Sequence, residues 1–230
     1  METRTKHRRA LITALNIFSI ILLGLVLQIG GAYLVNAAVN IMGAYDEASY
    51  AASAALQYSD FMSYIRTIEP KQFANVIFVA PLVEEIIFRL IFLRAGSMVF
   101  PFWAANLIQA ALFGLYHTLT IQKVYGFAIG IVIGCVFYYC PLIYRNYREA
   151  AGYRDNADTI SNLPNSLIGV AATFLLHVVI NAAGIFVAPL MPADISNTLQ
   201  IIIGSVFMLI AYAASYVLYY SSKKEMTDAR

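Results

Sequence analysis

Long apolar runs, separated by short polar connections, dominate the sequence. A transmembrane α-helix needs about 20 mostly apolar residues, because each residue rises ~1.5 Å and the hydrocarbon core is about 30 Å thick. Six runs approach or exceed that length: about Ala10–Ile41, Phe73–Leu93, Phe102–Leu119, Val124–Tyr144, Asn165–Val187 and Leu199–Tyr220. The pattern therefore predicts an all-α fold, a polytopic integral membrane bundle of about six transmembrane helices.

The first run and the stretch after it refine this prediction. The run that starts at Ala10 far exceeds the apolar region of a signal peptide, about 7–15 residues, so we expect a retained transmembrane helix. The following stretch, Asp46–Glu69, is too polar to span the membrane, and we expect it to form a helix at the interface. Pro70 should end that helix, because proline disfavours the helical conformation in the residue before it.

Composition agrees with a membrane protein. Of the 230 residues, 60% are hydrophobic and 12% are charged, whereas charged residues make up about 25% of a soluble domain. No polar stretch is long enough to fold alone, so we expect a single transmembrane domain over residues 1–230. The net charge of +2 gives no reason to expect a nucleic-acid partner, and the sequence indicates no oligomeric state.

The basic residues are distributed unevenly. Six spans place both termini on one side of the membrane, and eleven of the 15 Lys and Arg residues fall on that side against three on the other. The eleven are Arg4, Lys6, Arg8, Arg9, Arg94, Arg145, Arg148, Arg154, Lys223, Lys224 and Arg230, and the three are Arg66, Lys71 and Lys123. Because cytoplasmic loops carry the excess of Lys and Arg, we expect both termini to be cytoplasmic.

Three charged residues interrupt the second run, Phe73–Leu93. Glu84, Glu85 and Arg89 follow Pro81, which we expect to kink the helix. A charge at the bilayer centre costs roughly 2.5–3.5 kcal/mol on insertion scales, so three cost on the order of 8 kcal/mol, about what the apolar residues of the run return. These side chains must face a protein interior or a wet cavity, and they mark a candidate functional site.

Two further runs carry polar side chains on one face. His117 follows Phe113 by four residues, and Asn181 follows His177 by four, so each pair projects from one side of its helix. Other polar residues on these faces are Asn106, Gln109 and Thr173. Lipid satisfies none of these groups, so we expect the three polar faces to turn toward one another, with the amides and the threonine forming hydrogen bonds between helices.

The two adjacent carboxylates are expected to have different roles. Arg89 follows Glu85 by four residues, a spacing and orientation that favour an ion pair within one helix. We therefore expect these two residues to neutralise each other. Glu84 is then left without a partner, as a general base requires.

Three motifs occur in order along these helices. They are Glu-Glu-x-x-x-Arg at Glu84–Arg89, Phe-x-x-x-His at Phe113–His117 and His-x-x-x-Asn at His177–Asn181. In this order and with these separations, the chain resembles the CAAX protease and bacteriocin-processing family of intramembrane proteases, which includes the type II CAAX prenyl endopeptidases. The resemblance covers roughly Pro70–Ala188.

The resemblance implies an intramembrane endopeptidase that hydrolyses a peptide bond in a membrane-associated peptide or protein. Glu84 would take a proton from a water that His117 orients and polarises, and a carboxylate removed from water is a stronger base. His177 and Asn181 would then donate hydrogen bonds to the oxyanion. The supporting residues of the motifs would be Glu85, Arg89 and Phe113.

The resemblance also implies a location and partners. Only one expected span precedes the first motif, whereas the eukaryotic prenyl endopeptidases have more, so a prenylated substrate is not implied. The chain looks like the bacterial members, which are associated with processing of, or immunity to, peptides such as bacteriocins. We therefore expect a multi-pass protein of the bacterial cytoplasmic membrane, whose partners are the lipid bilayer and a membrane-associated substrate.

A metal-dependent site is the alternative chemistry. Glu84, His117 and His177 form a set of two histidines and a glutamate, which is the type that holds a catalytic zinc. However, Asn181 is a poor zinc ligand, and the His-Glu-x-x-His helix of zinc proteases is absent. We favour glutamate catalysis without a cofactor, with zinc as the alternative.

Two other functions fit the same residues. One is a non-catalytic membrane regulator or partner protein that keeps the fold. The other is a small ion or proton transporter that uses Glu84, His117 and His177 as a relay. The sequence has neither the inverted repeats nor the matching broken helices that typify transporters.

Overall fold

The computed structural model describes residues 2–44, 49–65, 67–150, 163–192 and 194–228. Over these ranges the chain is helical and contains no strand, which confirms the all-α membrane bundle predicted from the sequence. Arg66, Arg154 and Arg230, which the orientation argument used, lie outside the described residues. The cytoplasmic location of the termini stays a prediction.

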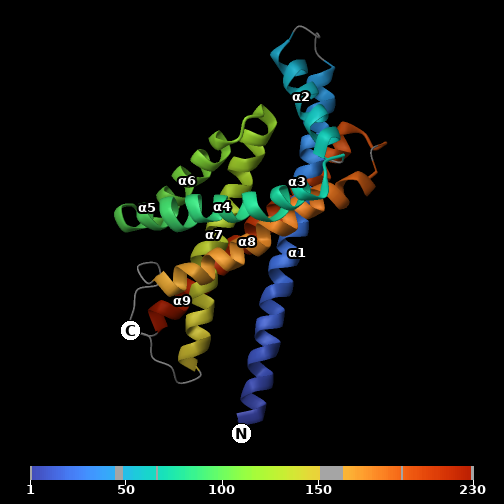
Figure 1. Cartoon of the computed structure of the whole chain (residues 1–230). Helices are drawn as coiled ribbons and strands as arrows, with labels where there is room; N and C mark the ends of the chain where they lie inside the picture. The colour runs from blue at the N-terminus through green and yellow to red at the C-terminus, as the bar shows by residue number, and fades with distance from the viewer. Residues whose placement is uncertain (1, 45–48, 66, 151–162, 193, 229–230) are drawn as a thin grey trace.

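The chain begins with two helices, α1 (Glu2–Gly43) and α2 (Tyr50–Ile65). The helix expected within Asp46–Glu69 is thus present as α2, which folds back beside the end of α1 (Figure 1). The other long helices are α6 (Phe102–Tyr116), α7 (Thr120–Ala150), α8 (Leu163–Phe186) and α9 (Asn197–Asp228), and a short 3-10 turn, η3 (Ala188–Leu190), follows α8.

One continuous helical segment carries the first motif and crosses α7 and α1 steeply (Figure 1). Its parts are α3 (Pro70–Ala74), η1 (Asn75–Val79), α4 (Ala80–Glu84), η2 (Glu85–Leu93) and α5 (Arg94–Val99). Pro70 is the first residue of α3, where its missing N–H costs no helical hydrogen bond. Pro81 follows η1, a stretch of wider π-helix. The helix continues past Pro81, because the wide turn accommodates a residue that lacks an N–H.

Four helical stretches are long and apolar enough to cross a membrane in the described part of the chain. They are Ala14–Gly43, Thr120–Pro141, Leu163–Leu190 and Asn197–Ser215. The expected third span is helical over α6, but α6 has 15 residues and is therefore about 22 Å long. The chain is a multi-pass membrane protein, and the count of six spans stays a prediction.

The main core lies where α1, α7, α8 and α9 meet. Leu27, Val132, Leu176 and Ala211 contribute one fully buried side chain from each of these helices. Small residues allow close approach at one of these contacts, since a Cβ on Gly204 of α9 would lie 2.8 Å from a backbone carbonyl oxygen of α1.

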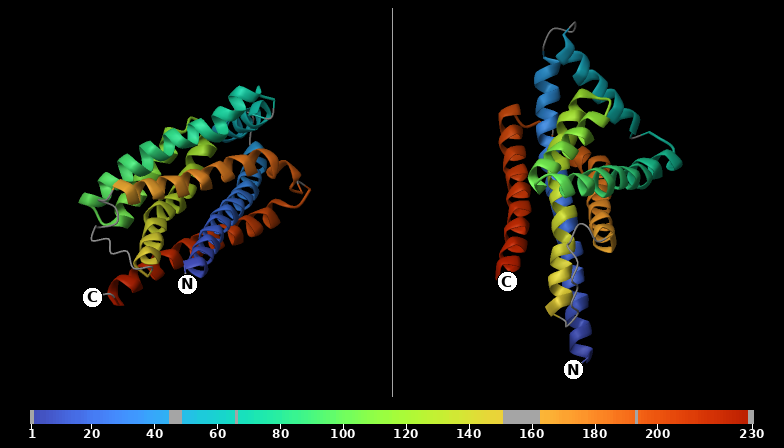
Figure 2. Two further views of the ribbon diagram at one scale, coloured as in Figure 1. Left: turned by 60° about the horizontal axis from the view of Figure 1, so that its bottom comes forward. Right: turned by 90° about the vertical axis from the view of Figure 1, so that its left-hand side faces the viewer.

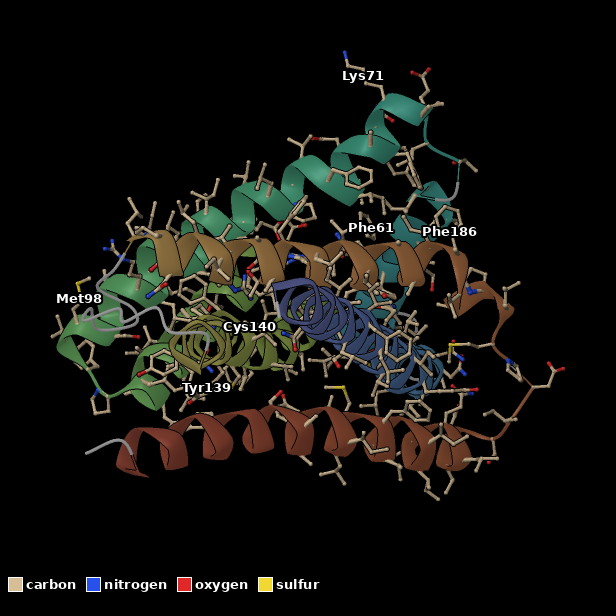
Figure 3. The ribbon with its side chains drawn as sticks, turned by 90° about the horizontal axis from the view of Figure 1, so that it is seen from below. Phe61, Lys71, Met98, Tyr139, Cys140 and Phe186 are labelled. Carbon is tan, nitrogen blue, oxygen red and sulfur yellow. The ribbon has the colours of Figure 1, made fainter. Side chains whose placement is uncertain are left out.

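The helices are arranged in layers around this core. Seen from below, α9 lies on one side of α1 and α7, and α8 with the helical segment 70–99 lies on the other (Figure 3). The first turns of α1 and the last turns of α9 point toward the same end of the bundle (Figure 2). This arrangement agrees with two termini on one side of the membrane.

Candidate active site

The two adjacent carboxylates face different surroundings. Glu84 is the last residue of α4 and Glu85 the first of η2, and successive helical residues point about 100° apart. The Glu85 side chain is fully buried, whereas 13% of the Glu84 side chain is exposed. Glu84 accepts no hydrogen bond from the described residues, so its carboxylate remains available to a ligand.

Glu85 connects two elements. Its Oε1 lies 3.2 Å from a terminal nitrogen of Arg89, so the ion pair expected from the sequence is present. The same oxygen accepts a hydrogen bond from Nδ1 of His177 on α8, at 2.8 Å. No pattern in the sequence indicates this second contact, which ties the first motif to the third.

The ring of Phe113 contacts the side chains of Arg89, His117 and His177. The guanidinium carbon of Arg89 lies 4.3 Å from the centre of its ring, within the range of a cation–π contact. The rings of His117 and His177 both approach the Phe113 ring edge to face, with centroids 5.0 and 5.8 Å away. Phe113 therefore holds the guanidinium and both imidazoles in fixed relative positions.

His117 lies one residue beyond the end of α6, rather than inside a span that continues to Leu119. Its Nδ1 lies 2.9 Å from the carbonyl oxygen of Phe113, one of the carbonyls that a helix end leaves without a helical partner. Because a carbonyl oxygen only accepts, Nδ1 carries the hydrogen. In a neutral imidazole, Nε2 is then the acceptor.

The same reasoning fixes the orientation of His177. Its Nδ1 donates to Glu85, and its Nε2 lies 3.6 Å from an oxygen of Glu84. Two carboxylates, one guanidinium and this imidazole therefore meet in one cluster.

Asn181 is held by a carbonyl that Pro81 leaves free. In the π-helical register the N–H of a residue bonds the carbonyl five residues before it, as Ala80 does with Asn75. Pro81 has no N–H, so the carbonyl of Val76 lacks a helical partner, and Asn181 Nδ2 donates to it at 3.0 Å. One N–H of the amide is engaged, and the second remains for a ligand.

One cavity of about 550 Å³ brings the four candidate catalytic residues together. Glu84, His117, His177 and Asn181 all line it. Helix α2, expected only to lie at the interface, covers one side of the cavity with Tyr58, Phe61, Met62 and Ile65; Phe61 is labelled in Figure 3.

The other polar residues singled out in the sequence do not line this cavity. Asn106 Nδ2 donates to the carbonyl oxygen of Ile131, and Gln109 Nε2 to that of Gly130, so both amides of α6 bind α7, as predicted. The hydroxyl of Thr173 lies 3.1 Å from the carbonyl oxygen of Gly169, in its own helix.

The sequence analysis did not place Gln28 of α1 or Tyr125 of α7 at this cavity. Gln28 is the amide nearest the middle of the first apolar run, which also contains Asn16, Asn36 and Asn40. An amide at that depth is the signal that could have identified it, because lipid leaves it unsatisfied.

Glu84, His117 and His177, the alternative zinc ligands, are not arranged around one point in the structure. Within the described ranges, no three His, Cys, Asp or Glu side chains are arranged to hold one metal ion. Each histidine uses Nδ1 in the protein, and Nε2 of His177 faces Glu84. Catalysis without a cofactor stays a prediction, and zinc stays its alternative.

The comparison with protein families bears on this cavity. Residues 68–148 match the family described as type II CAAX prenyl endopeptidase, Rce1-like. The match covers 81 of the 230 residues. No curated protein and no solved structure gives a significant match to the chain.

The Rce1-like segment runs from the start of α3 through most of α7 and contains the first two motifs. The Rce1-like family comprises intramembrane proteases, so the match supports a membrane protease. His177 and Asn181 lie beyond the matched residues, and their place in the site comes from the packing of α8 against η1 and η2.

Proposed function

We propose that the protein is an intramembrane endopeptidase that hydrolyses a peptide bond in a membrane-associated peptide or protein, with Glu84 as the base. The observation that supports this proposal is the cavity on which Glu84, His117, His177 and Asn181 converge from separate parts of the chain. These groups are of the types that activate a water and stabilise an oxyanion.

The first step is activation of water by Glu84. The carboxylate accepts one proton of a water in the cavity, and Nε2 of His117 accepts a hydrogen bond from the second hydrogen, which orients the attacking lone pair. The Nδ1 contact of His117 with Phe113 supports this role, since it leaves Nε2 as the acceptor. The resulting hydroxide adds to the substrate carbonyl carbon.

The second step is stabilisation of the oxyanion. His177 in its protonated form donates from Nε2, and Asn181 donates through the N–H that Val76 does not use. Loss of one such donor typically costs ~10²–10³ in rate. Glu85, paired with Arg89, stabilises the protonated imidazole through Nδ1.

The last step is release of the amine. Glu84 holds the proton taken from water and passes it to the leaving nitrogen as the carbon–nitrogen bond breaks. The products are a carboxylic acid and an amine, and the site returns to its initial charge. No cofactor enters these steps.

The proposal is tested by the peptides that accumulate in membranes. Strains that carry the wild-type gene, a deletion and Glu84→Gln are compared by mass spectrometry of membrane-bound peptides. We expect one precursor to accumulate in both the deletion and the Glu84→Gln strains, and purified wild-type protein to cleave it. Cleavage of that precursor by purified Glu84→Gln protein at the wild-type rate would refute the proposal.

A further inference from the structure

A second cavity, of about 410 Å³, adjoins the one that holds the candidate catalytic residues. It lies between α1, α2 and the turn after α8, which includes Pro189 and Pro192. Residues at the junction line both cavities: Gln28, Tyr58, Met62, Tyr125 and Gly184. A chain leaving the first cavity past Gly184 would therefore enter the second.

The junction presents a hydrogen-bond donor without a partner. The hydroxyl of Tyr125 donates to Oε1 of Gln28, so the amide nitrogen of Gln28 takes no part in this contact. Within the part of the chain that the structure describes, no group accepts a hydrogen bond from Nε2 of Gln28. This nitrogen is free to donate to a ligand that passes between the cavities.

Two glycines make room for this pair. A Cβ on Gly31 would clash with the ring of Tyr125, so only glycine lets the ring lie against α1. A Cβ on Gly184 would lie 3.1 Å from Nε2 of Gln28. The absence of a side chain there keeps the donor accessible from α8.

The spacing of residues along α8 gives the distance between the Gln28 donor and the candidate catalytic residues. His177, Asn181 and Gly184 lie on one face of the helix and line the first cavity. Gly184 follows His177 by seven residues, which is about 10 Å along the helix axis. An extended peptide covers that distance with about three residues.

The lining of the second cavity determines the chemistry of its ligand. No Asp, Glu, Lys, Arg or His contributes to it among the described residues. Its polar groups are neutral amides and hydroxyls, and they belong to Gln28, Tyr33, Asn36, Tyr58, Ser59, Ser63 and Tyr125. A charged side chain would lose its hydration in this cavity without gaining an opposite charge, so the lining favours an uncharged segment.

We infer that the second cavity binds an uncharged, extended peptide segment about three residues from the cleaved bond, and that Gln28 donates a hydrogen bond to a backbone carbonyl of that segment. This inference rests on the proposed function for its substrate. It adds a substrate-binding residue on α1, outside the matched family segment.

Cleavage of nested peptides tests the position of Gln28. The probe is a blocked nine-residue peptide of alanine, serine and leucine, with versions shortened one residue at a time from either end, and the full-length protein is reconstituted in liposomes. We expect Gln28→Met to raise KM for the long peptide about 5–10-fold with kcat unchanged, the value of one hydrogen bond. Peptides too short to reach the junction should show no difference between Gln28→Met and wild type.

The matched control is Gln57→Met, since Gln57 is exposed on α2 and lines neither cavity. It should leave KM and kcat unchanged. An equal loss at every peptide length would indicate a merely structural effect of Gln28→Met and overturn the inference, as would no loss at any length.

A measurement of peptide binding distinguishes a failure of this inference from a failure of the proposed function. The same nine-residue peptide, fluorescently labelled, is titrated into Glu84→Gln and Glu84→Gln/Gln28→Met proteins. We expect Kd to be about 5–10-fold higher in the protein that lacks Gln28. An aspartate placed three residues from the cleaved bond of the peptide should weaken binding at least about 10-fold. Gln28-dependent binding together with no cleavage by the wild type would overturn the proposed function alone. The inference would be overturned if the peptide does not bind. It would also be overturned if Kd is the same with and without Gln28, or the same for the peptide with and without the aspartate.

Discussion

Nδ1 of His177 lies 2.8 Å from Oε1 of Glu85, across the contact between α8 and η2. This hydrogen bond joins two motifs that are 92 residues apart in the sequence. It also aims the other imidazole nitrogen at Glu84. The buried carboxylate thus positions the imidazole, and its less buried neighbour remains free for water.

The first prediction concerns Glu84. Glu84→Gln keeps the size of the side chain and removes the base, so we expect kcat to fall about 10²–10⁴-fold. Because Glu84 accepts no hydrogen bond from the described residues, the melting temperature in detergent should change little. A variant that unfolds, or one that keeps its activity, would contradict the assignment.

The second prediction concerns the buried ion pair of Glu85 and Arg89. Glu85→Gln leaves the guanidinium without its carboxylate, and Arg89→Met leaves the carboxylate without its guanidinium; each should cost about 3–5 kcal/mol of stability. The double variant should recover much of that loss, because no uncompensated charge remains. A thermal-unfolding cycle of the four proteins checks this, and additive losses would contradict the pairing.

Cleavage should not recover in the same double variant. The neutral amide that replaces the Glu85 carboxylate would no longer stabilise the protonated form of His177, so we expect the double variant to be folded and at least about 10-fold slower than wild type. Recovery of both stability and rate would show that the carboxylate has only a structural role.

The third prediction links Pro81 to Asn181. Pro81→Ala supplies an N–H that competes with Asn181 for the carbonyl of Val76, so the amide loses its fixed orientation and kcat should fall about 10-fold. Asn181→Ala should cost more, ~10²–10³. Pro70→Ala is the control, because a proline at the first position of a helix leaves no carbonyl free, and it should retain the wild-type rate. Equal rates for Pro81→Ala and Pro70→Ala would contradict the link.

The fourth prediction concerns metal. Since the proposed steps use side chains alone, dialysis of the purified protein against 1,10-phenanthroline should leave the cleavage rate unchanged. A loss of activity that added zinc restores would instead support the zinc alternative, with Glu84, His117 and His177 rearranged as ligands.

Sequence reasoning predicted the helical fold and four residues that line the cavity, but not the contacts that hold these four in place. Apolar runs and charges inside them are local signals, so the helices, the Glu85–Arg89 pair and the amide contacts of α6 with α7 could be expected. The contact of His177 with Glu85 and that of Asn181 with Val76 depend on how α8 lies against η1 and η2. That register is a tertiary property, and no periodicity within one helix reports it.

The position of His117 was missed for a related reason. The apolar run continues past Tyr116 to Leu119, so hydropathy gives no sign that α6 ends first. The end of the helix is what frees the Phe113 carbonyl for the imidazole.

The short α6 has a consequence for the lipid around the protein. At about 22 Å it does not match a hydrocarbon layer of about 30 Å, and such hydrophobic mismatch is relieved by local thinning of the bilayer. If α6 spans the membrane, such thinning would draw headgroups and water inward at its end, next to His117. The membrane itself would thus bring water to the reacting bond, and shorter acyl chains should favour hydrolysis.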